Sequence, residues 1–242
     1  MPTPVLLEVC VESLASALAA EQGGAHRVEL CSHLAVEGVT PPAPLMEAVR
    51  RRISIPIHVL IRPRPGDFSY SPTEFEQMKN EIRRAKEVGV NGVVFGILDS
   101  SRVDGARTRA LAELARPLRV TFHRAFDVCG NLEEAFRNVL QTGADRILTS
   151  GGARTAEEGS AVLTRLVKLA EGRVGILACG TIREANVRRI IEETGVREVH
   201  ASFLQRSSKA QADAAAVTEQ RCSSLRPETV RRFLKAAELE IL

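Results

Sequence analysis

His123, Arg124 and Asp127 place three different functional groups within one short stretch of the chain. An imidazole exchanges protons near neutral pH, a guanidinium is a fixed cation, and a carboxylate can accept a proton or bind a cation. The residues just before them, 118–122, alternate apolar and polar side chains as a β-strand does. The three groups therefore lie at the end of a predicted strand, where they form either a functional site or a structural ion pair beside a buried imidazole.

Two other apolar segments each contain a carboxylate and a thiol. Glu8 lies two residues before Cys10, and Glu29 lies two residues before Cys31. Residues two apart on a strand share a face, and neighbouring parallel strands run about 4.8 Å apart, so the two thiols could approach closely. A pair of thiolates in a sheltered site suits a soft ion such as Cu(I). The alternative is that both cysteines are small buried apolar residues.

Carboxylates inside apolar strands need partners, because an unpaired buried charge is costly. Arg62 and Arg64 follow the third apolar segment of the chain and are natural candidates for that role. We therefore expect Glu8 or Glu29 to form an ion pair with Arg62 or Arg64, as part of a shared ionic cluster.

The segments that must position these groups recur along the chain in one order: strand, polar tip, helix, glycine. Strands are predicted at residues 5–10, 26–31, 55–61, 92–97, 118–122, 145–149, 173–178 and 197–201. Helices are predicted between them, and a glutamate at capping-box spacing marks helix starts at Ser71, Asn131, Thr155 and Thr181. Strands rich in valine, isoleucine and leucine with helices between them indicate a parallel sheet covered on both faces.

The number of strand–helix units favours one α/β architecture. Eight such units most economically close into a (β/α)8 TIM barrel with an eight-stranded parallel sheet. An open doubly wound sheet is the alternative, but no G-x-G-x-x-G motif follows the first strand. We expect residues 1–242 to form a single barrel domain, with an extra polar segment at 205–224 as a flexible loop and a closing helix at 227–239.

The composition excludes several classes of protein. The 33 basic and 30 acidic residues give a net charge of +3, too balanced for a nucleic-acid-binding protein. No apolar stretch approaches the ~18 residues that span a membrane, and the N-terminal residues lack the pattern of a signal peptide. The five cysteines are scattered, without a C-x-x-C pair, which argues against a disulfide framework and for a reducing compartment. A soluble cytoplasmic protein is expected.

A barrel of this kind carries its chemistry at the C-terminal ends of its strands, so the polar residues there are candidates for one site. The candidate metal ligands are Cys10 and Cys31; the candidate catalytic residues are Glu8, Glu29, His123 and Asp127; and the candidate ligand-binding residues are Arg62, Arg64, Arg124, Thr149 and His200. Two hypotheses follow. Either the cysteines bind Cu(I), or the protein is an enzyme in which the arginines hold the carboxylate or phosphate of a small anionic metabolite and a histidine or glutamate moves a proton.

Several of these segments resemble the CutC copper homeostasis family. The matching motifs are Leu7–Cys10, Gly23–Cys31, Ile61–Arg64, Thr121–Asp127 and Arg146–Gly151, and the similarity runs from about residue 6 to residue 203. The resemblance implies a TIM barrel, a cytosolic homo-oligomer such as a dimer or tetramer, and a role in copper handling, with Cu(I) as the bound ion. The chain departs from the family pattern at Val39, at Leu60 and in the Cys179–Thr181 segment, where glycine, methionine and a triple glycine are usual.

Overall fold

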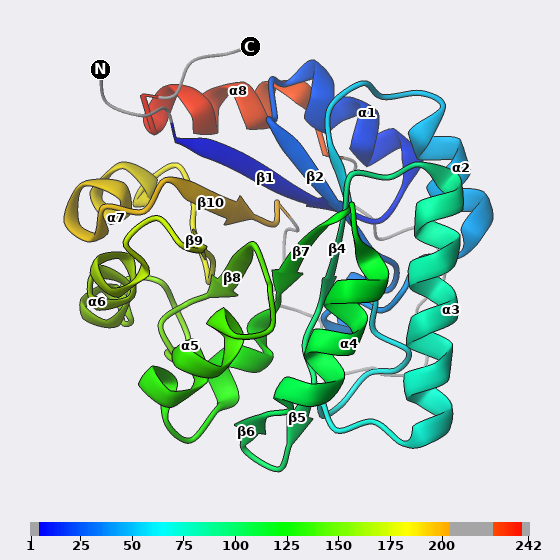
Figure 1. Cartoon of the computed structure of the whole chain (residues 1–242). Coiled ribbons are helices and arrows are strands. Elements are labelled where there is room, and N and C mark those ends of the chain that lie inside the picture. The colour runs from blue at the N-terminus through cyan, green and yellow to red at the C-terminus, as the bar shows by residue number, and fades with distance from the viewer. Residues whose placement is uncertain (1–4, 204–224, 239–242) are drawn as a thin grey trace, which may run out of the picture.

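The computed structural model describes residues 5–203 and 225–238, and its central feature is a closed barrel of parallel strands (Figure 1). The barrel strands are β1 (Leu6–Val11), β2 (Arg27–Leu30), β3 (Ile57–Leu60), β4 (Gly92–Phe95), β7 (Arg119–Phe122), β8 (Arg146–Thr149), β9 (Gly175–Ala178) and β10 (Glu198–Ala201). They follow one another around the barrel in chain order, and β10 closes it by pairing with β1. The predicted eight-stranded (β/α)8 barrel is confirmed.

Helices lie between the strands and cover the outside of the barrel (Figure 1). They are α1 (Leu14–Gln22), α2 (Ala43–Arg50), α3 (Pro72–Val88), α4 (Gly105–Ala115), α5 (Leu132–Leu140), α6 (Ser160–Ala170), α7 (Val187–Thr194) and α8 (Pro227–Ala236). The 3-10 helices η1 (Leu34–Val36) and η2 (Arg124–Val128) follow β2 and β7, and a hairpin of β5 (Leu98–Asp99) and β6 (Arg102–Val103) follows β4. This hairpin differs from the prediction, because strands of two residues carry no periodic pattern.

Of the helix starts predicted from capping-box spacing, those at Ser71 and Asn131 are right, and those at Thr155 and Thr181 are early. At α3, the Ser71 hydroxyl accepts a hydrogen bond from the Glu74 amide at 3.3 Å, and the Glu74 carboxylate accepts one from the Ser71 amide at 2.7 Å, which confirms the capping box. Thr155 caps only a turn, and α6 begins later. Thr181 has a φ of 57°, whereas an N-cap residue has an extended backbone, so α7 also begins later than predicted.

Alternate residues of each barrel strand face opposite sides of the barrel wall. One set is apolar and forms the main core between the barrel and its helices; Val9, Val28, Val59, Phe95 and Phe122 belong to it and are fully buried. The other set faces the barrel interior and is largely polar on β1, β2 and β10. The fold therefore places a polar interior inside an apolar shell.

Two glycines make room for polar side chains inside the barrel. A Cβ atom at Gly92 would lie 2.6 Å from the His58 ring, and one at Gly175 would lie 3.0 Å from a Glu198 carboxylate oxygen. Because protein interiors are closely packed, a larger residue at either position would displace the polar side chain beside it. The two glycines are thus part of what admits charged groups to the interior.

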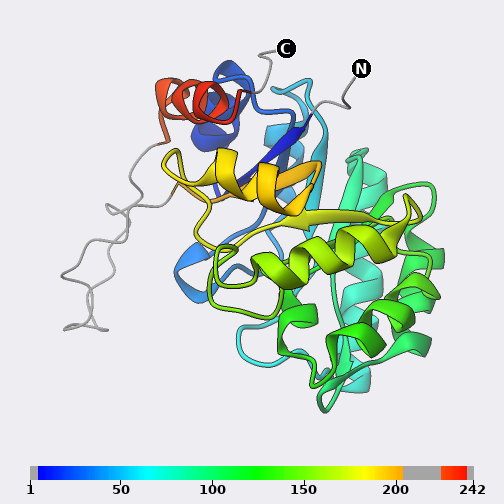
Figure 2. The ribbon, with the colours of Figure 1, turned by 90° about the vertical axis from the view of Figure 1, so that its left-hand side faces the viewer.

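The C-terminal helix α8 lies on the outside of the barrel beside α1, as two views show (Figure 1, Figure 2). It corresponds to the closing helix predicted at 227–239, and it ends at Ala236. The flexible loop predicted at 205–224 lies outside the described residues. Within residues 5–203 and 225–238, no helix is long and apolar enough to cross a membrane.

Candidate metal centre

Cys10 and Cys31 lie side by side on the inner wall of the barrel. Cys10 is on β1, and Cys31 directly follows the neighbouring strand β2. Their Sγ atoms are 3.8 Å apart, which confirms the close approach predicted from the sequence. Both residues are buried, with exposed fractions of 8% and 1%, and they cluster with Leu60 of β3 and Val94 of β4. The pair is therefore a sheltered dithiol with apolar side chains on one side.

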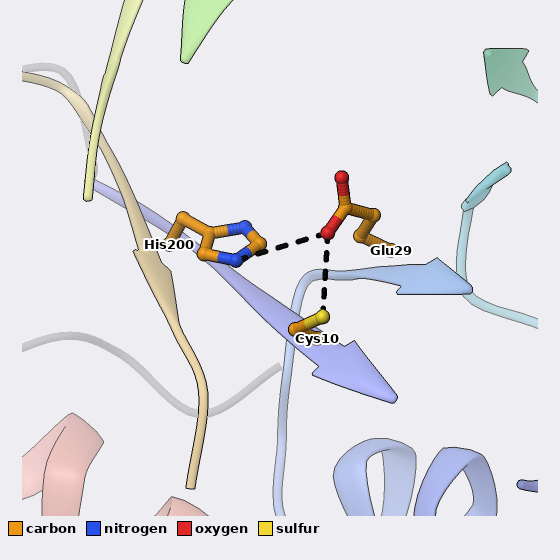
Figure 3. A group of neighbouring side chains, drawn as sticks. All are labelled: Cys10, Glu29 and His200. Atoms are coloured by element: carbon orange, nitrogen blue, oxygen red, sulfur yellow. Dashed lines mark hydrogen bonds and ion pairs between the residues drawn. The ribbon is translucent and has the colours of Figure 1, made fainter. Parts of the chain in front are cut away.

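His200 brings a nitrogen atom to the same place from β10, which flanks β1 on the side away from β2 (Figure 3). Its Nδ1 atom is 2.8 Å from Glu8 Oε1, and its Nε2 atom is 3.8 Å from Glu29 Oε2. The Cys10 thiol donates a hydrogen bond to the same Glu29 oxygen at 3.3 Å. One donor atom from each of Cys10, Glu29 and His200 lies within 4.8 Å of the other two, so these side chains could hold a metal ion.

Protons reside on the thiol and the imidazole of this centre. The hydrogen bond with Cys31, burial and the nearby Glu29 carboxylate raise the pKa of Cys10 well above its usual range. Burial also raises the pKa of Glu29. Burial alone would lower the pKa of His200, but contacts with Cys10 and Glu8 raise that pKa well above its usual range. A metal ion that binds here through sulfur and nitrogen must therefore displace one proton from Cys10 and one from the His200 ring.

Toward the N-terminal ends of the strands, a chain of ion pairs crosses the barrel interior. Arg27 pairs with Glu8 at 2.5 Å and with Glu198 at 2.7 Å, and Arg146 pairs with Glu198 at 2.7 Å. Burial would raise the pKa of Glu8, but Arg27 and His200 outweigh burial and hold that pKa well below its usual range. Glu8 is thus a fixed carboxylate that links the ion pairs to the ring of His200.

The predicted ion pair between the interior carboxylates and Arg62 or Arg64 is wrong. In the part of the chain that the structure describes, Glu8 and Glu29 pair with other residues and with neither of these arginines. The strand register explains the difference. Glu8 lies directly opposite Arg27 in the β1–β2 pair, whereas Arg62 and Arg64 lie beyond the end of β3.

Arg62 and Arg64 support the loops around the barrel mouth instead. The buried Arg62 guanidinium donates hydrogen bonds to the carbonyl oxygens of Gly38 and Gly66, at 2.9 and 2.8 Å, and so joins the loops that follow β2 and β3. Arg64 is partly exposed and pairs with Glu74 at 2.6 Å, at the start of α3. Both guanidinium groups are engaged with the protein, which weakens the hypothesis that they hold an anion.

Asp127 is bound by the loop that follows β8. Its carboxylate accepts hydrogen bonds from the amides of Ser150 and Gly152, at 3.1 and 3.0 Å. The hydroxyls of Thr149 and Ser150 also donate to it, and Arg124 pairs with it at 2.9 Å. The candidate residues Asp127, Thr149 and Arg124 therefore come together as predicted for a strand-end cluster, but they bind one another and the loop backbone.

His123 is buried beyond the end of β7, beside the ring of Phe68. Its Nδ1 atom accepts a hydrogen bond from the Ala125 amide at 3.2 Å, so the proton lies on Nε2. Among the described residues, Nε2 has no hydrogen-bond partner. Burial and the nearby charge of Arg62 lower the pKa of His123 to about 3. The imidazole is neutral at neutral pH and far from the pKa that suits proton transfer there.

Four interior residues were not predicted from the sequence as part of a site. They are Arg27, His58, Arg146 and Glu198. Two of them could have been found from strand periodicity, because Arg27 lies two residues before Glu29 and Glu198 lies two residues before His200, on the same faces. His58 has no such neighbour. Burial and the charge of Arg27 lower the pKa of His58 to about 3, so it is a neutral interior side chain.

Sequence comparison relates the chain to the CutC family. The CutC family model matches residues 5–205. The copper homeostasis protein cutC homolog of Homo sapiens is 44% identical over 198 residues, which cover 81% of this chain and 72% of the human protein. A family protein CutC from Chromobacterium violaceum is also 44% identical, over 81% of this chain and 80% of its own length.

Solved structures agree on the fold. The putative copper homeostasis protein CutC from Streptococcus agalactiae matches with a TM-score of 0.77 at 31% identity, covering 81% of this chain and 97% of that one. Thiamine phosphate pyrophosphorylase from Pyrococcus furiosus matches with a TM-score of 0.62 at 16% identity, over 98% of this chain and 96% of that one. The second likeness shows a shared barrel fold and carries no information about activity.

Proposed function

The chain belongs to the CutC family, and from this premise we propose that it takes part in copper homeostasis by binding Cu(I) between the thiols of Cys10 and Cys31. The observation that carries the proposal is the 3.8 Å separation of two buried Sγ atoms on the inner barrel wall. Thiolates are soft ligands of the kind that select Cu(I). The names of the human and Streptococcus agalactiae relatives, which refer to copper homeostasis, also support it.

The surroundings of the thiols suit a bound cation. Leu60 and Val94 shield the pair on one side, which limits the access of water to the ion. Binding between two thiolates requires both Cys10 and Cys31 to give up a proton. The Glu29 carboxylate already accepts the hydrogen bond from Cys10 at 3.3 Å, so it is placed to receive the Cys10 proton. Copper is the cargo in this proposal, and the protein supplies the sulfur ligands and a path for the proton.

The proposal includes a cellular setting and an assembly. Thiols stay reduced in the cytosol, so a Cu(I) site made of free cysteines belongs in the cytoplasm. We also propose that residues 1–242 form a single domain that assembles as a homo-oligomer, as the family resemblance implies. The balanced net charge of +3 gives no support to a nucleic-acid partner.

A competition titration against a chromophoric Cu(I) chelator, under reducing and oxygen-free conditions, tests the proposal. The wild-type protein should remove one equivalent of Cu(I) from the chelator. The Cys10→Ser/Cys31→Ser protein should lose this binding, because a serine hydroxyl is a hard and poorly ionised substitute for a thiolate. Cys129→Ser is the matched control, since the Cys129 thiol lies after η2 and donates to the Ala125 carbonyl. Unchanged affinity in the double-serine protein would defeat the proposal.

A second candidate function is that of an enzyme acting on a small anionic metabolite at the barrel mouth. One observation favours it: the Arg124 side chain is 45% exposed, so a cation faces solvent there. The buried bonds of Arg62 and the low pKa of His123 count against it. A thermal-shift screen of small carboxylates and phosphates tests this candidate. A ligand that stabilises the wild-type protein but not Arg124→Ala would support it, and a screen without such a ligand would remove it.

A further inference from the structure

We infer that the Nε2 atom of His200 is a third ligand of the copper ion, so that Cys10, Cys31 and His200 bind it together. This inference rests on the proposed function and adds a residue from β10, on the side of β1 away from Cys31. The sequence alone predicts that His200 binds an anion. In the structure its imidazole lies between two carboxylates, those of Glu8 and Glu29, which suits a cation instead.

The separation of the two sulfur atoms favours three ligands over two. With metal–sulfur bonds of about 2.3 Å, two thiolates on opposite sides of an ion lie about 4.6 Å apart, and two at a trigonal angle lie about 4.0 Å apart. The observed separation of the Cys10 and Cys31 Sγ atoms is 3.8 Å, which is close to the second value. Two thiolates held at this distance bind an ion from one side and leave a coordination position on the other.

The ring of His200 presents its Nε2 atom to Cys10 from the side away from β2, and this atom can bind the ion once it has lost its proton. Its Nδ1 atom contacts Glu8 Oε1 at 2.8 Å, which leaves Nε2 on the side of Cys10 and Glu29 (Figure 3). Glu8 is itself fixed, because Arg27 holds its other carboxylate oxygen at 2.5 Å. Metal-binding histidines are almost always oriented in this way, by an acceptor on the ring nitrogen that does not bind the metal. Glu8 is therefore a positioning residue for the third ligand.

Glu29 is the competing third ligand, and its chemistry disfavours it. Carboxylate oxygens suit hard cations such as Mg²⁺ and Ca²⁺, whereas imidazole nitrogen is an established ligand of copper. Glu29 Oε2 lies 3.3 Å from the Cys10 Sγ atom and 3.8 Å from the His200 Nε2 atom. This position lets Glu29 serve as a counter-charge beside the ion while sulfur and nitrogen bind it.

Copper K-edge X-ray absorption of the wild-type protein, loaded with one equivalent of Cu(I), reads the ligand set directly. We expect two sulfur neighbours and one nitrogen neighbour. A spectrum described by two sulfur neighbours alone would overturn this inference and leave the proposed function standing. A spectrum without sulfur neighbours would overturn the proposed function itself. Because the measurement needs no substitution, it does not depend on how well any variant folds.

His200→Ala and His58→Ala form a matched pair for the chelator competition. Both histidines lie near Glu8, at 2.8 and 3.8 Å, but only His200 belongs to the group of possible ligands. His200→Ala should weaken Cu(I) binding by at least about tenfold, a loss that even indirect partners of a metal commonly cause, and His58→Ala should keep the wild-type affinity. If His200→Ala binds as wild type while the double-serine protein loses binding, the third ligand is wrong and the thiol pair is right.

Discussion

The wall formed by β10, β1 and β2 and the loops at the ends of β7 and β8 carry similar kinds of residue and use them differently. On the wall, the Cys10 and Cys31 sulfur atoms lie 3.8 Å apart, and Cys10, Glu29 and His200 bring donor atoms within 4.8 Å of one another. At the ends of β7 and β8, Asp127 and Arg124 bind each other and the neighbouring loop. The contacts of the first region join potential metal ligands through protons that an ion can displace, and those of the second join a carboxylate to the backbone and hold the loop.

Residue type and place in the barrel do not separate these two regions, since barrels in general carry polar residues at this end. The two regions differ in the groups to which their polar atoms are hydrogen-bonded. Backbone amides such as those of Ser150 and Gly152 form the kind of hollow that binds a phosphate or carboxylate ligand. In this chain the carboxylate of Asp127 accepts both amides. A candidate site is therefore best recognised by the partners of its polar atoms: the Asp127 carboxylate is bonded to the backbone, whereas Cys10 contacts other side chains that can bind an ion.

The largest loss of stability is expected for Glu8→Ala, which removes the carboxylate that orients His200. Arg27 would then keep its charge inside the barrel after losing its 2.5 Å partner, and breaking a buried ion pair in this way typically costs about 3–5 kcal/mol. Urea unfolding followed by circular dichroism measures the loss. Glu133→Ala removes a partly exposed partner of Arg165 and should cost less than about 1 kcal/mol. Equal losses in the two variants would contradict the stabilising role of the interior ion pairs.

The next largest loss of stability is expected at the ends of β7 and β8, where a substitution should lower stability without changing copper binding. Asp127→Ala should lower the free energy of unfolding by about 2–4 kcal/mol, because the amides of Ser150 and Gly152 and the Arg124 guanidinium lose a charged acceptor. Its Cu(I) affinity in the chelator competition should match the wild-type value. Asp127→Asn keeps one acceptor oxygen and should lose less stability. If folded Asp127→Ala failed to bind Cu(I), the two regions would be one site.

The barrel and the thiol pair could be predicted because both follow from local patterns. Hydrophobic periodicity and glycines between elements are readable within a few residues. The two-residue spacing of Glu8 and Cys10, repeated at Glu29 and Cys31, places both thiols on one face of adjacent strands. The start of α7 could not be read in this way, because the left-handed backbone at Thr181 is set by the loop around it.

The partners of the charged residues could not be predicted, because they depend on register and on loop conformation. A shift of one residue between β1 and β2 would take Arg27 away from its place opposite Glu8, and no local pattern reports that shift. The bonds of Asp127 depend on the backbone path through Ser150 and Gly152 after β8. The type and approximate place of the site residues were therefore predictable, and their partners were not.

Acid should destabilise the folded protein through two buried histidines, His58 and His123. In the folded protein the pKa values of His58 and His123 are about 3, below the usual 6.5. Between these pH values the unfolded chain binds protons that the folded chain does not, so the full stability is present above about pH 6.5 and falls as the pH drops. Each histidine should cost about 1.4 kcal/mol per pH unit in that range, or about 2 kcal/mol at pH 5.

Unfolding free energies of wild type and His123→Asn, measured from pH 7 to pH 5, check this dependence. The variant lacks one of the two groups, so its stability should fall less steeply with acid. A variant with the same slope as wild type would mean that His123 does not keep its low pKa in solution.

The smallest loss of stability is expected for Arg64→Ala, for which Arg62, two residues away, is the buried counterpart. Partly exposed ion pairs such as that of Arg64 with Glu74 contribute little, so the melting temperature should fall by about 2 °C or less. Arg62 is 3% exposed, and Arg62→Ala would leave the carbonyls of Gly38 and Gly66 without their buried donor. Its melting temperature should fall several times further. Equal shifts in calorimetry would mean that burial does not decide which polar residues hold the barrel mouth together.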